Sequence, residues 1–269
     1  DLAALEPLGA PRWHLLIEAL RAAFADARWY VSDPAFNPIP LAGLLSSAYA
    51  AERRRLINPE RATLDVQRGA PVTASGTVYL CAVDGRGNAC SLINSNYMGF
   101  GTGIVPADSA GRPWGFTLQN RGHNFSLDPA HPNALQPGKR PYHTIIPGLL
   151  TRADGTLYGP FGVMGGFMQP QGHVQVVVGL ADDGLNPQAA LDRPRFCIED
   201  GQAGGAVLLE AGLPADLVDG LRRRGHPLRA GIGGYARANF GRGQIIRRDP
   251  DGVLWGGSDP RADGCALGY

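Results

Sequence analysis

The chain has 269 residues, which is long enough for one large core or two modest domains. Its 25 Lys and Arg residues nearly balance its 24 Asp and Glu residues, and the basic residues are scattered, so we expect no nucleic-acid partner. The longest apolar runs fall far short of the roughly 20 residues that span a bilayer, and the first residues form no basic and apolar leader. We therefore expect a soluble protein without a membrane partner. The sequence leaves its location open and favours the cytoplasm over the periplasm or the outside of the cell.

The cysteine, glycine and proline contents indicate what kind of fold to expect. Cys81, Cys90, Cys197 and Cys265 are too sparse for a disulfide scaffold and include no CxxC pair, so we interpret them as buried or idle thiols. The 38 Gly and 22 Pro residues alternate with apolar segments, which predicts many turns and short elements rather than disorder.

Two helices and a linker are predicted in the first part of the chain. Apolar residues recur at helical spacing from Pro11 to Val31, which predicts an amphipathic helix with its Arg and Asp residues facing outward. A second helix is predicted from Leu41 to Arg55, after a Pro-rich break. From Asn58 to Ser75 the periodicity disappears, which is typical of a linker.

The pattern changes abruptly at Thr77. Two β-rich runs, Thr77 to Asp84 and Ala89 to Ile93, are joined by Asp-Gly and Gly-Asn and predict a hairpin. We expect the middle of the chain to be mostly sheet. Further strands are predicted at Trp114 to Leu118, Thr144 to Leu150 and Leu157 to Val163.

Helices return in the last third of the chain. Gln169 to Ala181 favours a buried helix, although its β-branched residues leave a strand open as the alternative. Shorter helices are predicted at Pro187 to Leu191 and Pro214 to Arg224, and strands near Gly243 to Ile246 and Val253 to Trp255. We expect sheets with helices on their outer faces.

Several ordered motifs carry a resemblance to a known family. They are residues 77–84, Phe100-Gly101-Thr102-Gly103-Ile104-Val105, Gly138-Lys139-Arg140-Pro141, Met164-Gly165-Gly166, and Gly257-Ser258-Asp259-Pro260-Arg261 with the final Gly268-Tyr269. In order and spacing they resemble the small subunit of γ-glutamyltransferases, and the segment before Thr77 resembles the end of that family's large subunit.

The resemblance implies an α+β fold, the four-layer αββα sandwich of N-terminal-nucleophile hydrolases. Residues 1–76 would be the helical and linker end of the large subunit, and residues 77–269 the catalytic region of the small subunit. By itself, Thr77 is only a small polar residue that opens a strand. The resemblance makes Gly76 and Thr77 the site of self-cleavage. The freed amine of Thr77, whose ordinary pKa is roughly 7.7 to 8.0, could then accept the proton of its own hydroxyl.

Three further residues are implied to assist the nucleophile. Gly165 and Gly166 match two glycines whose amides bind the developing oxyanion, and the alternative is a simple turn at a strand end. Ser95 stands where the family has a threonine that supports the nucleophile, and the alternative is an ordinary strand-end serine.

The implied substrate-binding residues depart from the family pattern. Tyr97 replaces an asparagine, Arg121 and Asn124 replace a glutamine and an aspartate near the donor's α-amine, and His143 and Thr144 replace paired serines. The change from Asp to Asn removes the anion that would pair with an ammonium, while Arg121 adds a cation. We therefore expect a donor acyl group with less positive or more negative charge than γ-glutamyl. A structural role for Arg121 and His143 is the alternative.

Other site chemistries find little support. His123, His131 and His143 match no metal-binding spacing, the glycines at 99, 101 and 103 lack a following GK[ST], and no GxSxG elbow occurs. We expect no metal and no cofactor.

The sequence thus predicts an autoprocessed amidase or acyltransferase that acts on a small-molecule amide through an ester on Thr77. The alternatives are a cephalosporin-acylase-like amidase and a non-catalytic member that serves as a binding or structural subunit. The family's proenzyme is about twice as long, and its first half supplies an arginine that contacts the donor. Either this chain is a piece, or a second chain supplies that half, or the enzyme works without it; exposed apolar surface before Thr77 would then drive oligomerisation.

Overall fold

The computed structural model describes residues 1–65 and 77–269. The helices are α1 (Ala10–Tyr30), α2 (Leu41–Leu44), α3 (Ser47–Arg54), α4 (Met168–Ala181), α5 (Pro187–Asp192) and α6 (Ala215–Arg223), with short 3₁₀ turns η1 (Arg121–Asn124), η2 (Glu199–Gly201) and η3 (Gly234–Phe240). The strands are β1 (Thr77–Val83), β2 (Ala89–Ser95), β3 (Gly148–Thr151), β4 (Leu157–Met164), β5 (Phe196–Ile198), β6 (Val207–Glu210), β7 (Leu228–Ile232), β8 (Arg242–Arg248) and β9 (Leu254–Ser258). No helix in these residues is long and apolar enough to span a bilayer.

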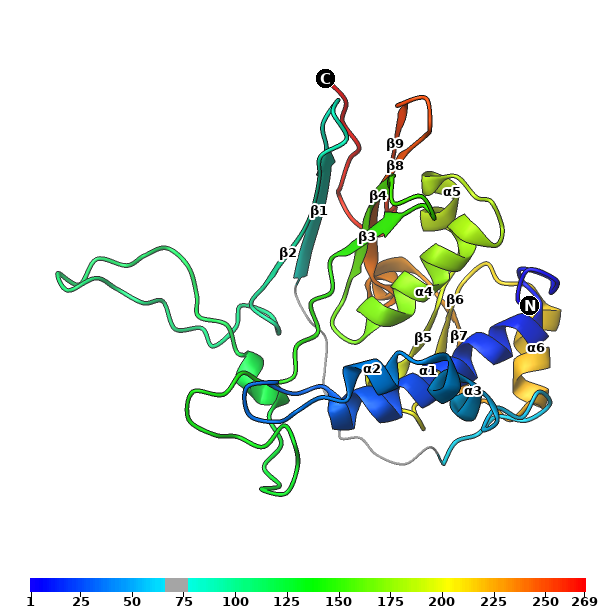
Figure 1. Cartoon of the computed structure of the whole chain (residues 1–269), viewed down its shortest axis with the longest axis horizontal. Coiled ribbons are helices and arrows are strands. Elements are labelled where there is room, and N and C mark those ends of the chain that lie inside the picture. Colours follow the sequence, from blue (N-terminus) through cyan, green and yellow to red (C-terminus); the bar gives the residue numbers. More distant parts are fainter. Residues whose placement is uncertain (66–76) are drawn as a thin grey trace.

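The strands form three sheets, ordered β1-β2, β3-β4-β8-β9 and β5-β6-β7 (Figure 1). All pairs are antiparallel except β6 with β7. Successive residues of β4 face opposite sides of its sheet. A Cβ atom on Gly162 would lie 2.6 Å from the ring of Tyr79 in β1, whereas Val163 lies against Gly172 of α4. The four-stranded sheet is therefore packed between α4 on one face and the β1-β2 hairpin on the other.

The expectation that the charged residues of α1 face outward is wrong. Arg12 and Arg21 are almost completely buried, because neighbouring elements surround the helix on several sides. Arg12 lies 2.7 Å from the carboxylate of Asp183, just beyond the end of α4, and Arg21 lies 3.6 Å from Glu18. Buried guanidinium groups require such partners, since an unpaired buried charge is strongly destabilising.

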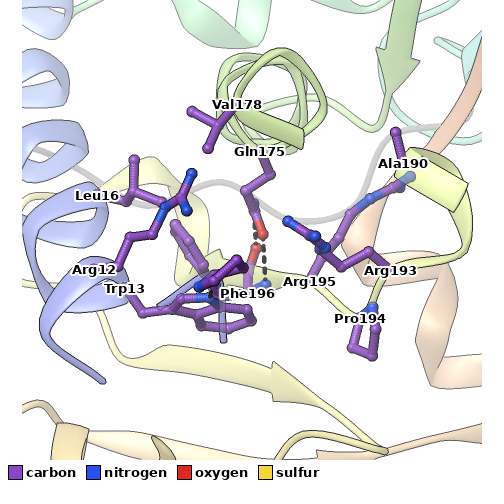
Figure 2. A pocket seen from close by; sticks show the side chains of 11 residues that line it. Arg12, Trp13, Leu16, Gln175, Val178, Ala190, Arg193, Pro194, Arg195 and Phe196 are labelled. Atoms are coloured by element: carbon purple, nitrogen blue, oxygen red, sulfur yellow. Dashed lines mark hydrogen bonds between the residues drawn. The ribbon is translucent and has the colours of Figure 1, made fainter. Parts of the chain in front are cut away.

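Figure 2 shows the region where the start of α1 meets α4 and the chain entering β5. The side-chain amide of Gln175 both donates to and accepts from the backbone of Phe196, at 3.0 and 2.9 Å. Trp13 packs against the Phe196 ring, with centroids 5.3 Å apart. The cavity between these groups measures about 20 Å³, which is room for about one water molecule. This region is therefore part of the packed core and offers no substrate site.

Two other predictions in the first half of the chain are corrected. The helix expected from Leu41 to Arg55 is divided into α2 and α3, because the hydroxyl of Ser46 accepts a hydrogen bond from Tyr49 N at 3.1 Å and caps a new helix. The predicted linker has no helix or strand in residues 58–65, and its remainder lies outside the described residues.

The expectation of a mostly sheet middle is also wrong. The strand predicted at residues 114–118 is absent, and residues 96–147 carry no strand apart from isolated bridges. Side chains hold this segment together instead: Asn120 accepts from Met98 N at 3.0 Å and donates to Gly101 O at 3.0 Å. The strand predicted from Thr144 begins only at Gly148, because the amide of Ile146 donates to Gln169 Oε1 rather than to a neighbouring strand.

The remaining predicted elements are confirmed. The β1-β2 hairpin, β4, α4, α5, α6, β8 and β9 occur where the sequence predicts them, within a few residues. The Gln169 to Ala181 segment is a helix rather than a strand, while β5, β6 and β7 were not predicted. The four cysteines are free thiols, of which Cys197 is buried, Cys81 is half-buried, and Cys90 and Cys265 are exposed.

Candidate active site

Thr77 and Ser95 face each other at the open end of the hairpin. They form the last register pair of β1 and β2, and the Thr77 hydroxyl donates to Ser95 Oγ at 3.0 Å. Thr77 is buried, so its hydroxyl is held in a defined position. The structure thus brings together the predicted nucleophile and the predicted supporting hydroxyl, while Gly76 lies outside the described residues.

Tyr97 continues this network in an unusual backbone conformation. Its φ of 80° lies in the left-handed region, and it is the single non-glycine residue with positive φ in the described part of the chain. Such a conformation costs of order 1–3 kcal/mol and persists only when the surroundings enforce it. Here the Tyr97 amide donates to Ser95 Oγ at 2.9 Å, and its hydroxyl donates to Asn124 Oδ1 at 2.6 Å. The strained residue therefore connects the nucleophile pair to the expected donor-binding residues.

Arg121 adds a buried positive charge to the network. Its guanidinium lies 5.1 Å from the centre of the Tyr97 ring, and its Nη1 donates to Thr144 Oγ1 at 3.1 Å. Its Nη2 is buried and has no hydrogen-bond partner among the described residues. Burial lowers the pKa of Arg121 from its usual value, but a guanidinium stays charged in proteins. This cation therefore has one donor group free for a further acceptor.

His143 and Asn124 complete the set of predicted substrate-binding residues. Partial burial and then the charge of Arg121 lower the pKa of His143, so its imidazole is neutral at neutral pH. His143 Nδ1 accepts from Ile145 N at 3.2 Å, whereas Asn124 Nδ2 donates to Tyr142 O at 3.0 Å. Asn124 thus presents no negative charge to the site, and the acceptor oxygen of its amide is already bonded to Tyr97.

Gly165 and Gly166 connect β4 to α4 in conformations that side chains resist. Their φ angles are 137° and 59°. Their carbonyls accept from Met168 N at 3.0 Å and Gln169 N at 3.1 Å, while their amides donate to no group in the described residues. Two adjacent unused amides are the feature that an oxyanion site requires. The interpretation as a simple turn also stays open, because the same carbonyls start α4.

The glycine pair and the predicted substrate-binding residues share a cavity, whose lining does not include Thr77. No hydrogen bond joins Thr77 directly to the glycine pair within the described residues. However, Gly166, His143 and Thr144 together line one cavity of about 200 Å³, and Tyr79 packs β1 against β4 just before the glycine pair. The structure therefore places Gly166 beside His143 and Thr144 and packs the strand that begins at Thr77 against β4, while the catalytic role of each residue stays a prediction.

The histidines considered for metal binding do not gather. His123 is exposed, and His131 packs its ring against Trp29 with centroids 4.8 Å apart. A different buried cluster, which the sequence did not reveal, contains His14, Glu18 and His226 within 4.8 Å of one another. The one local signal for it was the spacing of four residues between His14 and Glu18 on one helix face.

The side chains of this cluster already form hydrogen bonds with the backbone of the segment that follows α3. His14 contacts His226 at 2.7 Å and Asn58 O at 2.7 Å, while Glu18 accepts from Thr63 N at 2.9 Å. Arg21 lies beside Glu18 and would repel a divalent cation. The cluster is therefore best explained as a clasp between α1, the turn before β7, and residues 58–63.

Comparison with known proteins places this geometry in a family. The sequence profile of the Gamma-glutamyltranspeptidase family matches residues 1–269. The chain is 33% identical, over 100% of its length and 49% of the relative, to the Glutathione hydrolase-like YwrD proenzyme of Bacillus subtilis. It is 32% identical, over 95% of its length and 47% of the relative, to the Oxamate amidohydrolase proenzyme of Klebsiella pneumoniae.

A solved structure extends the comparison to three dimensions. The cephalosporin acylase from Bacillus halodurans is 50% identical and superposes with a TM-score of 0.83, over 96% of this chain and 45% of that chain. The expected N-terminal-nucleophile hydrolase fold is thereby confirmed. This chain spans about half the length of the curated relatives that it matches.

Proposed function

Because the chain belongs to the gamma-glutamyltranspeptidase family, we propose that it carries the catalytic half of an amidase or acyltransferase that uses Thr77 as its nucleophile. The observation that carries this proposal is the buried pair of Thr77 and Ser95 hydroxyls, 3.0 Å apart at the first residue of β1. The relatives named as proenzymes support cleavage before this residue.

Cleavage between Gly76 and Thr77 would supply the base. The freed amine of Thr77 accepts the proton of its own hydroxyl as the oxygen attacks the carbonyl carbon of an amide. Negative charge then moves to the carbonyl oxygen, where the amides of Gly165 and Gly166 donate hydrogen bonds. The leaving amine takes the proton from the Thr77 ammonium, and an ester remains on Thr77. Water or an amine acceptor releases the acyl group and regenerates the hydroxyl.

The donor site favours an acyl group that lacks the positive charge of a γ-glutamyl α-amine. Arg121 has a buried guanidinium whose Nη2 finds no acceptor among residues 1–65 and 77–269, and its Nη1 donates to a hydroxyl rather than to a carboxylate. Asn124 offers no anion to an ammonium, and His143 is neutral at neutral pH. A carboxylate on the acyl group would pair with Arg121, whereas an ammonium would be repelled.

An amidase of the cephalosporin-acylase type is the second candidate. The 50% identity to the Bacillus halodurans protein favours it, and the altered donor residues agree with a donor other than γ-glutamyl. The third candidate, a non-catalytic subunit, predicts that loss of the Thr77 hydroxyl changes nothing.

The partner of this chain would be the other half of the proenzyme, as further residues of the same polypeptide or as a second chain. The hairpin face that points away from β4 carries Val78, Leu80 and Leu92, whose exposed fractions are 64%, 47% and 47%. Before Thr77, Leu41 and Leu45 are exposed to 60% and 78%. Apolar surface of this extent supports a covering partner or an oligomer.

The decisive test compares Thr77→Ala with Thr77→Ser in the complete proenzyme. The proposal predicts that Thr77→Ala abolishes both cleavage and turnover of acyl p-nitroanilides, while Thr77→Ser keeps a hydroxyl and retains both in part. Sedimentation would report whether the fold and its assembly survive. Unchanged cleavage and turnover in Thr77→Ala would contradict the proposal and favour the non-catalytic candidate.

A further inference from the structure

The cavity shared by Gly166, His143 and Thr144 extends well beyond the expected donor-binding residues. Its volume of about 200 Å³ is ten times that of the cavity in Figure 2, so it can hold a group far larger than a water molecule. The larger cavity is bounded by the second half of α1, residues 142–146, and the start of α4.

The lining of this cavity combines a few polar groups with a larger number of apolar ones. The polar groups include the Thr144 hydroxyl, which binds Arg121, and the backbone of Gly166, whose amide is unused within the described residues. The second half of α1 contributes apolar side chains, and others come from residues next to the polar groups. The apolar lining includes Ala23, Phe24, Ala27, Ile146, Phe167 and Pro170.

A lining with few polar groups and apolar side chains on α1 suits one orientation of an amide substrate. A carbonyl oxygen held by the Gly165 and Gly166 amides would lie beside the cavity, and the group attached to the carbonyl carbon could then extend toward α1. An acyl chain that carries an ammonium would lose its hydration against this wall without gaining an anionic partner. An apolar group would instead exchange water contact for contact with Phe24 and Phe167.

We propose that this cavity is an acyl-binding pocket for amides whose acyl group has an apolar body about the size of a phenyl ring. This inference rests on the proposed function, because it takes the glycine pair as the site of the scissile carbonyl. Any carboxylate on such an acyl group would bind near Arg121, which contacts the lining residue Thr144, rather than against the apolar lining. The residues that set the acyl size are Ala23 and Ala27, since each leaves space that a larger side chain on α1 would fill.

Substitutions on one helix test the pocket with an internal control. Ala27→Leu and Ala23→Leu place isobutyl groups into the cavity, whereas Ala19→Leu adds the same group to an exposed position one turn earlier that does not line it. All three changes suit a helix, because leucine is a good helix former. The measurement is kcat/KM for phenylacetyl and acetyl p-nitroanilides in the complete proenzyme.

The pocket predicts that Ala27→Leu and Ala23→Leu each lower the phenylacetyl to acetyl selectivity ratio at least tenfold, and that Ala19→Leu leaves it unchanged. An unchanged ratio in both variants would overturn the inference while leaving Thr77 chemistry intact. Ala23→Leu, at the exposed mouth of the cavity, keeps the test valid if Ala27→Leu does not fold.

A binding measurement shows whether the pocket inference or the proposed function is wrong. In the Thr77→Ala protein, saturable binding of phenylacetamide, followed by NMR, should weaken at least tenfold when Ala27→Leu is added. If the wild-type protein turned over no amide but this binding pattern held, the proposed function would fail and the pocket would stand. If phenylacetamide did not bind to the Thr77→Ala protein, the pocket would be wrong.

Discussion

The nucleophile end and the substrate end of the candidate site differ in how closely their residues follow the pattern that the family resemblance predicts. At the nucleophile end, the resemblance assigns Thr77 and the Gly165-Gly166 pair unchanged, and Ser95 keeps the expected hydroxyl at 3.0 Å from Thr77. At the substrate end, every residue assigned by the resemblance differs, and Arg121, whose Nη2 has no partner among the described residues, stands for a neutral amide. On the proposed function, acyl transfer is kept while the accepted acyl group has changed.

The glycine pair should show the largest effect. Gly165→Ala forces a side chain into a φ of 137° and within 3.3 Å of Met168 Cβ and Gly241 Cα, so the loop must shift. Loss of one oxyanion donor typically lowers kcat about 10² to 10³-fold, and we expect a fall of that order in acyl p-nitroanilide turnover.

Gly155→Ala is the matched control, because Gly155 also has a positive φ of 83° but lies in open space at the β3-β4 turn. It should lower the free energy of unfolding by about 1 kcal/mol and leave kcat unchanged. Equal losses of kcat in the two variants would argue against a special role for the loop.

Restoring the family's residues should reverse the change at the substrate end. The double variant Arg121→Gln with Asn124→Asp removes the cation and returns an anion for an ammonium. We expect kcat/KM to rise roughly 10 to 100-fold for γ-glutamyl p-nitroanilide and to fall similarly for the glutaryl compound, from the usual strength of charged hydrogen bonds. A fall of the same size for both donors would indicate a structural role for Arg121.

A smaller decrease in kcat is expected for Ser95, which binds both Thr77 at the nucleophile end and Tyr97 at the substrate end. Ser95→Ala removes the acceptor of both the Thr77 hydroxyl and the Tyr97 amide. A lost hydrogen bond of about 0.5–1.5 kcal/mol predicts a decrease in kcat of roughly 2 to 13-fold. Ser95→Thr, the family's residue, is the control and should retain activity, whereas an equal loss in both variants would contradict the supporting role.

The smallest effect concerns stability rather than catalysis. Burial, then the charges of Arg21, His14 and Arg224, lower the pKa of His226 to about 3. Between that value and the ordinary 6.5, the unfolded chain binds more protons at this histidine than the folded chain does. The contribution of His226 to the free energy of unfolding is therefore fully present above pH 6.5 and is lost as the pH falls toward 3. Urea unfolding should show this slope, and His226→Asn should reduce it.

His123→Asn is the control for that experiment, because His123 is exposed and lies outside the clasp. An unchanged slope in His226→Asn would show that other groups, such as half-buried His173 with its pKa lowered by desolvation to about 4, dominate the acid sensitivity of the stability.

Local patterns predicted the elements that position the nucleophile. The hairpin was evident because two β-rich runs flank a turn, and α4 because its length favours a helix over a strand. By contrast, β5 and β6 are short and wholly buried, so no alternation of apolar and polar residues marks them. The structure of residues 96–147 could not be predicted from local patterns, because its order depends on side-chain hydrogen bonds such as those of Asn120.

The candidate site shows the same division. Thr77 and the glycine pair were found through ordered motifs. The positive φ of Tyr97 and the apolar cavity beside Gly166 are products of tertiary packing and required the structure.

The central claim is that Thr77 becomes an amino-terminal residue and thereby acquires its base. Amino-terminal sequencing of the purified complete protein tests it most directly. We predict a new terminus that begins Thr77-Val78-Tyr79 in the wild-type protein and its absence in Thr77→Ala. A protein that hydrolyses amides while the peptide bond before Thr77 remains intact would contradict this account.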